Sequence, residues 1–273
     1  MCRACGGLKA WELTTKPFTY ECTACGRQTS VTAGTVFHRS HLPLLTWFLA
    51  IHAVTSHSNG VSALQLQAQI GLGSYKTAWL MLQKLRRAMV DPDRSLLADL
   101  VEVDESEIPY REKNDPVAGG QGRSPIGKIH IIGAIELSLD GHPRRIRLAP
   151  LANFSGKSIS GFVTGAIEKG ATIISDGFSS YRTLTDYNHQ AHVVGTMAAH
   201  VVLPWIHRVF ANFKRWALGT YHGVRRPHLQ RYLDEFVFRW NRRRHMKSSF
   251  DTLLRITAHL PHAGYQESIQ RCV

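Results

Sequence analysis

Two aspartates lie in or directly after apolar segments that are typical of buried strands. Asp104 interrupts the segment Val101 to Ser106, and Asp176 follows the segment Thr172 to Ser175. Carboxylates are ligands for Mg²⁺ or Mn²⁺. Two such ions can activate the attacking oxygen and stabilise the leaving oxygen in phosphodiester chemistry. Two carboxylates of this kind, followed by a polar residue on a later helix, indicate a ribonuclease-H-like metal site.

Each aspartate also has a structural interpretation. Side-chain alternation sets Asp104 on the same strand face as Glu102 and opposite Glu105. An unpaired carboxylate in a buried strand is costly, so Asp104 needs a cation, a structural partner or access to solvent. Asp176 taken alone is better explained as the cap of a short helix that begins near Ser179. The two aspartates together, in a basic chain, favour the metal site.

Four cysteines near the N-terminus form two Cys-x-x-Cys pairs. Cys2 and Cys5 are separated by sixteen residues from Cys22 and Cys25, a spacing that places four thiolates around Zn²⁺. Glycine after the second cysteine of each pair permits the tight turn that this geometry requires. Two disulfides or two redox pairs are the alternatives, and a reducing compartment disfavours them. The zinc site would be structural, because four sulfur ligands leave no open position.

The charge balance indicates a polyanionic partner. The chain of 273 residues has 33 Lys and Arg against 20 Asp and Glu, a formal net charge of +13. Such a surplus favours nucleic acid, because binding releases condensed counterions. No secretory or transit segment opens the sequence, and the longest apolar run, Leu42 to Val54, is too short to span a bilayer. We therefore expect a cytoplasmic protein.

The segment after the cysteines predicts a helix-turn-helix. Ser62 is a candidate N-cap for a short helix through Ile70, a glycine-containing turn follows, and Ser74 precedes a helix that runs to about Met89. In this layout the side chains of Tyr75 and Lys76 can reach base edges or phosphates. An α-hairpin that only packs on its neighbour is the alternative.

The remaining chain predicts a mixed α/β fold, with a ribonuclease-H-like domain after a zinc ribbon and a helix-turn-helix-type helical domain. The expected domains are residues 1–37, 38–92 and 93–273. The strands and helices behind this prediction are Leu100 to Ser106, Lys128 to Leu137 and Arg144 to Leu151 as strands, Ser155 to Glu168 as a helix, Ala171 to Ser175 as a strand, Ser179 to Leu184 as a short helix and His192 to Val194 as a fifth strand.

Basic residues in the C-terminal helices are candidate contacts for a nucleic-acid backbone. Arginines and aromatic residues alternate in the segment Phe238 to Lys247, so one helix face can pack while the arginines follow phosphates. A solvated helix end is the alternative. The candidates are Arg215, Arg239, Arg242, Arg243 and Arg244.

Several motifs spread over nearly the whole chain resemble those of DDE-type insertion-sequence transposases that carry a zinc ribbon and an ISXO-like catalytic domain. This resemblance implies a ribonuclease-H-like domain that uses two Mg²⁺ or Mn²⁺ ions to cut and join DNA at the ends of a mobile element, with Asp104 and Asp176 as the first two metal ligands. The matching motifs are Cys22-x-x-Cys25 with Gly34-Thr35-Val36-Phe37, Val103-Asp104-Glu105, Gly127-Lys128, Asp176-Gly177-x-x-x-Tyr181, Tyr221-His222-Gly223-Val224, His228-Leu229-x-x-Tyr232 and Glu235-Phe236-x-Phe238-Arg239-x-Asn241-Arg242.

The third metal position departs from the acidic pattern of the family. The residue that matches the usual Glu is His207, at a position where the family varies among Glu, Asn and His. Neutral imidazole is a softer ligand, which suits manganese better than magnesium. Lys214 lies seven residues later, on the same helix face and roughly 10 Å along the axis, where it can meet a DNA phosphate. Asn212 is a weaker candidate for the ligand.

The resemblance also implies partners. The expected partner is double-stranded DNA, as element ends and as target, bound by a homo-oligomer of this chain. A catalytically inactive or domesticated DNA-binding regulator and a structure-specific nuclease of the same superfamily are the alternative functions. The pair Asp104 and Asp176 argues against the regulator, whereas His207 leaves it open.

Overall fold

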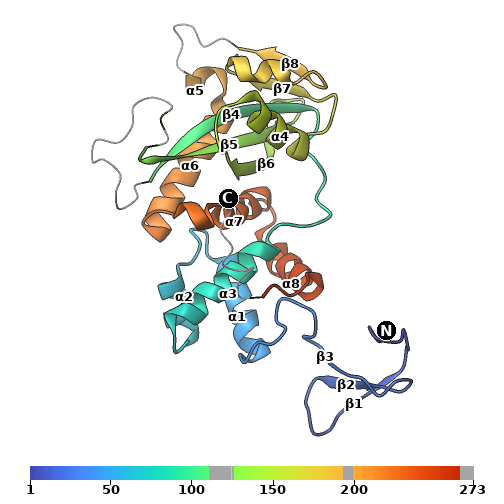
Figure 1. The fold of residues 1–273 in the computed structure, drawn as a ribbon. Coiled ribbons are helices and arrows are strands. Elements are labelled where there is room, and N and C mark those ends of the chain that lie inside the picture. Colours follow the sequence, from blue (N-terminus) through green and yellow to red (C-terminus); the bar gives the residue numbers. More distant parts are fainter. Residues whose placement is uncertain (111–123, 125, 193–198, 265–273) are drawn as a thin grey trace.

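The computed structural model describes residues 1–110, 124, 126–192 and 199–264. It contains a small N-terminal sheet, a cluster of helices, and a larger mixed sheet with helices on both faces (Figure 1). Within these ranges, no helix has both the length and the apolar character needed to cross a membrane.

The N-terminal sheet is antiparallel and small. Its strands β1 (Ala10–Glu12), β2 (Thr19–Cys22) and β3 (Gln28–Ser30) are each three or four residues long, in the order β1-β2-β3. Their side chains are exposed or only partly buried, and Cys22 is the buried exception within the strands. A sheet with so little core depends on another cross-link for stability.

The helical cluster contains the predicted helix-turn-helix elements. These are α1 (Leu44–Ser56), α2 (Ala63–Ile70) and α3 (Tyr75–Ala88). The Ser62 cap is confirmed, since its side chain accepts a hydrogen bond from Gln65 N at 3.2 Å. Gly71 ends α2 in the left-handed region, at φ 67°. Ser74 is the N-cap residue of α3, but its side chain makes no capping hydrogen bond.

Residues from the end of the chain complete this helical core. Phe238 of α7 (Leu229–Asn241) and two side chains of α8 (Ser249–His259) pack in the same apolar cluster as α1, α2 and α3. Val36 N also donates to the Thr257 carbonyl of α8 at 3.2 Å. The division at residues 37 and 92 stays a prediction, but the helical unit draws part of its core from residues beyond 93.

The larger sheet has the strand order expected of a ribonuclease-H-like domain. Its strands are β4 (Leu100–Pro109), β5 (Lys128–Leu137), β6 (Pro143–Pro150), β7 (Thr172–Ser175) and β8 (Asn188–Ala191), in the order β6-β5-β4-β7-β8. The first three pair antiparallel, and β7 and β8 are added in parallel. Thus β4, the strand with Asp104, is central.

Helices cover both faces of this sheet. Val101 and Val103 of β4 share one apolar cluster with α4 (Gly156–Ala166). The opposite face packs against α6 (Pro204–Tyr221) and α7. Alternation along β4 therefore turns Glu102 and Asp104 toward α6. The shorter elements are the helix α5 (Ala199–Val202) and the 3-10 helices η1 (Ser179–Thr183), η2 (Arg226–His228) and η3 (Met246–Ser248).

Several element boundaries differ from the sequence prediction. The first strand of the sheet continues past Ser106 to Pro109, and the helix expected through Glu168 ends at Ala166. The fifth strand, expected at His192 to Val194, lies earlier, and residues 193 and 194 fall outside the described ranges. As a mostly exposed edge strand of polar residues, β8 carries no apolar alternation that the sequence could reveal.

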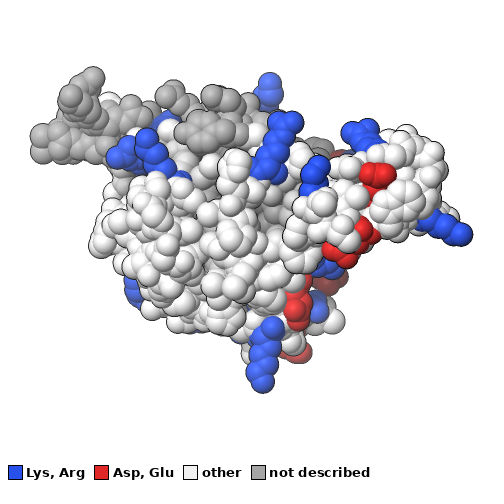
Figure 2. Space-filling view, turned by 90° about the horizontal axis from the view of Figure 1, so that it is seen from below, with Lys and Arg blue, Asp and Glu red and all other residues white. Residues whose placement is uncertain are grey.

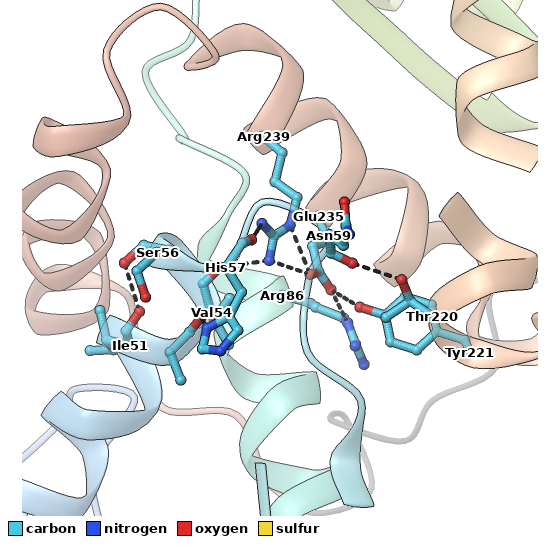
Figure 3. A network of polar contacts seen from close by, with 12 residues as sticks. Ile51, Val54, Ser56, His57, Asn59, Arg86, Thr220, Tyr221, Glu235 and Arg239 are labelled. Carbon is cyan, nitrogen blue, oxygen red and sulfur yellow. Dashed lines mark hydrogen bonds and ion pairs between the residues drawn. The ribbon is translucent and has the colours of Figure 1, made fainter. Parts of the chain in front are cut away.

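A buried ion pair joins the helical cluster to the domain with the larger sheet. Arg86 Nε of α3 lies 2.8 Å from Glu235 Oε2 of α7, and both side chains are at most 2% exposed. Tyr221 Oη and Arg239 also donate to Glu235, each at 3.0 Å (Figure 3). Burial opposes ionisation, yet Arg86 and Arg239 lower the pKa of Glu235 below its ordinary value.

Removal of one partner should leave a buried charge uncompensated. We expect Arg86→Ala to lower the free energy of unfolding by about 3–5 kcal/mol, measured by denaturant titration. Lys76→Ala, at an exposed position of the same helix, should cost less than about 0.5 kcal/mol. Equal losses in the two variants would show that the Arg86–Glu235 pair does not join the two parts.

Candidate active site and zinc centre

Asp104 lies at the middle of the sheet, under α6. It pairs with Gly133 of β5 and is 8% exposed. A Cβ at Gly133 would lie 2.9 Å from both Ile206 Cδ1 and Phe210 Cε1 of α6, and 2.7 Å from Leu148 Cδ2. Only glycine therefore allows α6 to approach the sheet this closely beside Asp104.

Glu102 fixes the start of α6. Its Oε2 accepts hydrogen bonds from Trp205 N at 3.0 Å and Ile206 N at 2.8 Å. A carboxylate at a helix N-terminus satisfies unpaired amides and complements the helix dipole. Burial raises the pKa of Glu102, and the two amide hydrogen bonds oppose that shift. The sequence placed Glu102 on the face of Asp104 but gave it no role.

The first turn of α6 brings His207 to Asp104. His207 Nε2 lies 3.4 Å from Asp104 Oδ2. Burial raises the pKa of Asp104 to about 7, and the nearby charges of Glu105, Asp176 and Glu102 add to this rise. A buried carboxylate surrounded by other carboxylates is an unfavourable arrangement that a bound cation would relieve.

Asp176 directly follows β7, the strand next to β4. The parallel ladder pairs Glu102 with Ile174, and each aspartate comes two residues later in the sequence, Asp104 within β4 and Asp176 one residue beyond the end of β7. Asp176 Oδ1 accepts a hydrogen bond from Phe178 N at 2.9 Å, so Asp176 also makes a local turn. Its side chain does not cap η1, whose N-cap residue is Phe178.

Lys214 lies near the carboxylates of Glu107 and Asp104, whereas Asn212 lies at a different part of α6. Burial lowers the pKa of Lys214, and the charges of Glu107 and Asp104 oppose the shift. Asn212 instead lines a cavity together with Arg215. The position next to Asp104 on α6 therefore belongs to His207, and Asn212 is not placed to substitute for it.

These side chains form a donor set that fits Mg²⁺ or Mn²⁺, namely two carboxylates and one imidazole. Asp104 and His207 are in contact, and Asp176 is near enough to affect the pKa of Asp104. In the part of the chain that the structure describes, only the four cysteines converge as a group of three or more candidate ligands. The assignment of Asp104, Asp176 and His207 as ligands of one site therefore stays a prediction.

The four cysteines form a compact centre. The Sγ atoms of Cys2, Cys5, Cys22 and Cys25 all lie within 4.8 Å of one another. Cys2 lies 3.7 Å from Cys25 and Cys5 lies 3.6 Å from Cys22. These distances exclude disulfide bonds, which are about 2.05 Å long. A tetrahedron with Zn–S bonds of about 2.3 Å has edges of about 3.8 Å, so the centre fits zinc.

Backbone hydrogen bonds lower the pKa of Cys2 and Cys22, whereas at Cys25 the backbone amide of Arg27 is outweighed by the neighbouring thiols and burial, which raise the pKa of that thiol. Gly6 and Gly26 adopt positive φ angles of 75° and 68° after the second cysteine of each pair, as the spacing predicted. Ala4 N donates to Cys2 Sγ at 3.4 Å. The backbone amides of Ala4 and Cys5 lower the pKa of Cys2 to about 6, which favours the ligand form of the thiol.

The candidate contacts to DNA differ in how accessible they are. Tyr75 and Lys76 are exposed at the start of α3, and Arg215 and Arg244 are exposed on α6 and after α7. Arg242 is half-buried, with its guanidinium 4.1 Å from the centre of the Phe238 ring. Accessibility alone therefore retains the four exposed side chains as candidates.

Two of the arginines have structural contacts instead. Arg239 donates to Glu235 and to the carbonyls of Val54 and His57 (Figure 3). Arg243 donates to the carbonyls of Pro143 and Arg144. These contacts favour a structural role for Arg239, because its donors are occupied and its side chain is 11% exposed, and its contact with DNA stays a prediction. The sequence could not distinguish these two arginines from arginines that contact DNA, since their partners are backbone carbonyls far away in the sequence.

The chain is similar to proteins of transposable elements in both sequence and structure. The chain is 26% identical over 258 residues to an uncharacterized protein in transposable element ISH50 of Halobacterium salinarum, with 86% of this chain and 84% of the relative covered. Among solved structures, a pre-cleavage Mos1 transpososome matches at a TM-score of 0.33, with 13% identity and coverage of 80% and 79% of the two chains. A Mos1 mariner paired-end complex with Mn matches at 0.34, with 12% identity and 79% of each chain.

A family model provides the assignment. The model described as ISXO2-like transposase domain matches residues 96–241, a range that contains Asp104, Asp176 and His207. The match spans more than half of the chain, so this protein belongs to the ISXO2-like transposase family.

Proposed function

We propose that this chain is a DNA transposase that binds the ends of an insertion sequence and catalyses metal-dependent strand cleavage and strand transfer. The main support is the contact between His207 Nε2 and Asp104 Oδ2 at 3.4 Å, with Asp176 directly after the adjacent strand β7. This contact unites residues about a hundred positions apart at the centre of the sheet. It gives the imidazole a place in the donor set that the family's usual carboxylate would fill.

Each side chain has a distinct role in this proposal. Asp104, Asp176 and His207 would hold Mg²⁺ or Mn²⁺, which supplies activation of the attacking oxygen and stabilisation of the leaving one. Glu102 holds the start of α6 and so orients His207. Lys214 lies on α6, the helix that carries His207, and is near Asp104. It would neutralise a phosphate of the bound strand.

DNA recognition is proposed for the exposed start of α3. Tyr75 and Lys76 follow the turn between α2 and α3, where a helix-turn-helix presents side chains to the major groove. Figure 2 looks onto this helical end and shows lysine and arginine side chains at several separate points, with acidic side chains gathered on one side. Because the basic residues there are dispersed, the position of α3 supports the interface better than charge density does.

Loss of a metal ligand should abolish cleavage. We expect Asp104→Asn and Asp176→Asn to reduce cleavage and joining of linear DNA with element ends in Mn²⁺ by more than about 100-fold, because even changes to groups that only orient ligands cost 10–100-fold. Asp186→Asn, at an exposed ion pair with Lys169, is the matched control and should keep full activity. Intact cleavage by either ligand variant would refute the catalytic assignment.

Zinc should be bound only while the four thiolates are present. We expect about one zinc ion per chain by elemental analysis, because four ligands fill one tetrahedral site. Cys5→Ser and Cys22→Ser should lose it, and both should melt at a lower temperature. Cys272→Ser, outside the described ranges, is the control and should retain the ion. Full zinc content in Cys22→Ser would contradict the proposed centre.

A phosphate contact at the start of α3 should appear in the salt dependence of DNA binding. For Lys76→Ala, the slope of log K against log salt should become shallower by about 0.9, the value for one contact. Lys169→Ala removes a charge from an exposed ion pair on the opposite domain and should leave the slope unchanged. An unaltered slope in Lys76→Ala would remove this position from the interface.

A further inference from the structure

A cavity of about 640 Å³ lies between the α1–α2 connection, α6 and α7. We propose that this cavity, called the arginine–tryptophan pocket, binds one unstacked nucleotide of a DNA strand, with its base against tryptophan and its phosphate at Arg215. The proposal rests on the proposed function, because it assumes DNA as the ligand. The pocket is formed mainly by Asn59, Arg215, Trp216, Phe236, Trp240 and Arg243.

The walls of the pocket are held in place by contacts within the protein. Thr220 Oγ1 of α6 donates to the Asn59 carbonyl at 2.7 Å, and Arg239 Nη1 donates to the His57 carbonyl at 2.7 Å (Figure 3). Gly60 has a φ of +77°, and a Cβ there would lie 3.1 Å from Trp216 Nε1. The α1–α2 connection therefore lies tightly against α6, and the pocket is preformed.

Aromatic rings give the pocket a surface for a base. The ring centre of Phe236 lies 5.6 Å from that of Trp216 and 6.3 Å from that of Trp240. Trp240 Nε1 donates to the Arg144 carbonyl at 3.1 Å, which holds its ring. Trp216 Nε1 is buried without a hydrogen-bond partner among the residues that the structure describes. Ring faces held in this way stack on any base.

The charge of the pocket selects an anionic ligand. Arg215 is exposed and forms no ion pair or hydrogen bond within the described ranges. Arg243 lies 4.6 Å from the centre of the Trp240 ring and donates only to carbonyls, so its charge is not neutralised. The carboxylate beneath, Glu235, is already matched by Arg86 and Arg239. Excess positive charge beside aromatic rings fits a nucleotide better than a neutral or cationic ligand.

The pocket and the candidate metal site share α6 but lie on different faces of this helix. Lys214, whose pKa responds to Asp104 and Glu107, is followed directly by Arg215 at the pocket. His207 and Trp216 are separated by about 13 Å along the helix axis. A strand that reaches both sites must therefore pass around α6, from Lys214 on one face to Arg215 on the next.

Binding of single-stranded DNA tests the proposal without added divalent metal. The probes are a fluorescein-labelled 12-nucleotide oligothymidylate and the same strand with abasic sites at its centre. Stacking of a base on an aromatic side chain contributes about 1–3 kcal/mol, so wild-type protein should bind the intact strand about 5- to 150-fold more tightly. Equal binding of the two strands by wild-type protein would overturn the proposal.

Variants locate the preference. Trp240→Ala should lose the preference for the intact strand yet bind the abasic strand as wild type does, whereas Trp240→Phe should keep most of the preference. Arg215→Ala should weaken both strands equally. Arg255→Ala removes an exposed arginine of α8 that pairs with Asp91. This variant should change the affinity for neither strand. An unchanged preference in Trp240→Ala, or equal effects of Arg215→Ala and Arg255→Ala, would refute the pocket.

Two further comparisons keep the result unambiguous. Circular dichroism and thermal melting establish that each variant folds. If Trp240→Ala does not fold, Arg215→Ala, at an exposed position of α6, still tests the phosphate contact, and unchanged affinity would overturn it. Asp186→Asn, at the exposed ion pair with Lys169, should bind both strands as wild type does, and binding is measured without the divalent metal that cleavage requires. A failure of the pocket proposal would therefore leave the cleavage experiment interpretable. A failure of the protein to cleave DNA would likewise leave the binding result interpretable.

Discussion

The candidate active site depends on one interaction, the capping of α6 by the buried carboxylate of Glu102. Oε2 of Glu102 binds the amides of Trp205 and Ile206, so the helix start is fixed to the central strand two residues before Asp104. His207 then follows in the first turn and reaches Asp104 Oδ2. The glycine at position 133 removes the side chain that would hold α6 away. A candidate ligand from the last third of the chain is thereby placed beside a candidate ligand from the middle.

A second set of contacts determines how the helical cluster is oriented relative to this site. Glu235 binds Arg86 from α3, Tyr221 from the end of α6 and Arg239 on its own helix, and Arg239 extends to the carbonyls that end α1. The candidate recognition helix is thus joined through buried charges to the helix that carries His207. Charges at this depth allow few alternative arrangements, because any that separates them leaves an unpaired ion.

Much of this architecture was predictable from local sequence patterns. The cysteine spacing, the Ser62 cap and the apolar strand segments depend on neighbours in the sequence, and the structure agrees with them. The exposed edge strand β8 was misplaced because it lacks alternation. The roles of Glu102, Arg239 and Asn241 were not predictable, since their partners are distant backbone groups. Asn241, for example, binds both the amide and the carbonyl of Ile146 at the edge of the sheet.

The central claim is that α6, docked on Glu102, makes the imidazole of His207 a ligand of the same ion as Asp104. Pulsed electron paramagnetic resonance of the protein with one equivalent of Mn²⁺ measures this directly, because a coordinated imidazole nitrogen couples to the electron spin. The account predicts a nitrogen coupling in the wild-type protein that disappears in His207→Ala. A wild-type spectrum with no nitrogen coupling, or an identical coupling in His207→Ala, would contradict it.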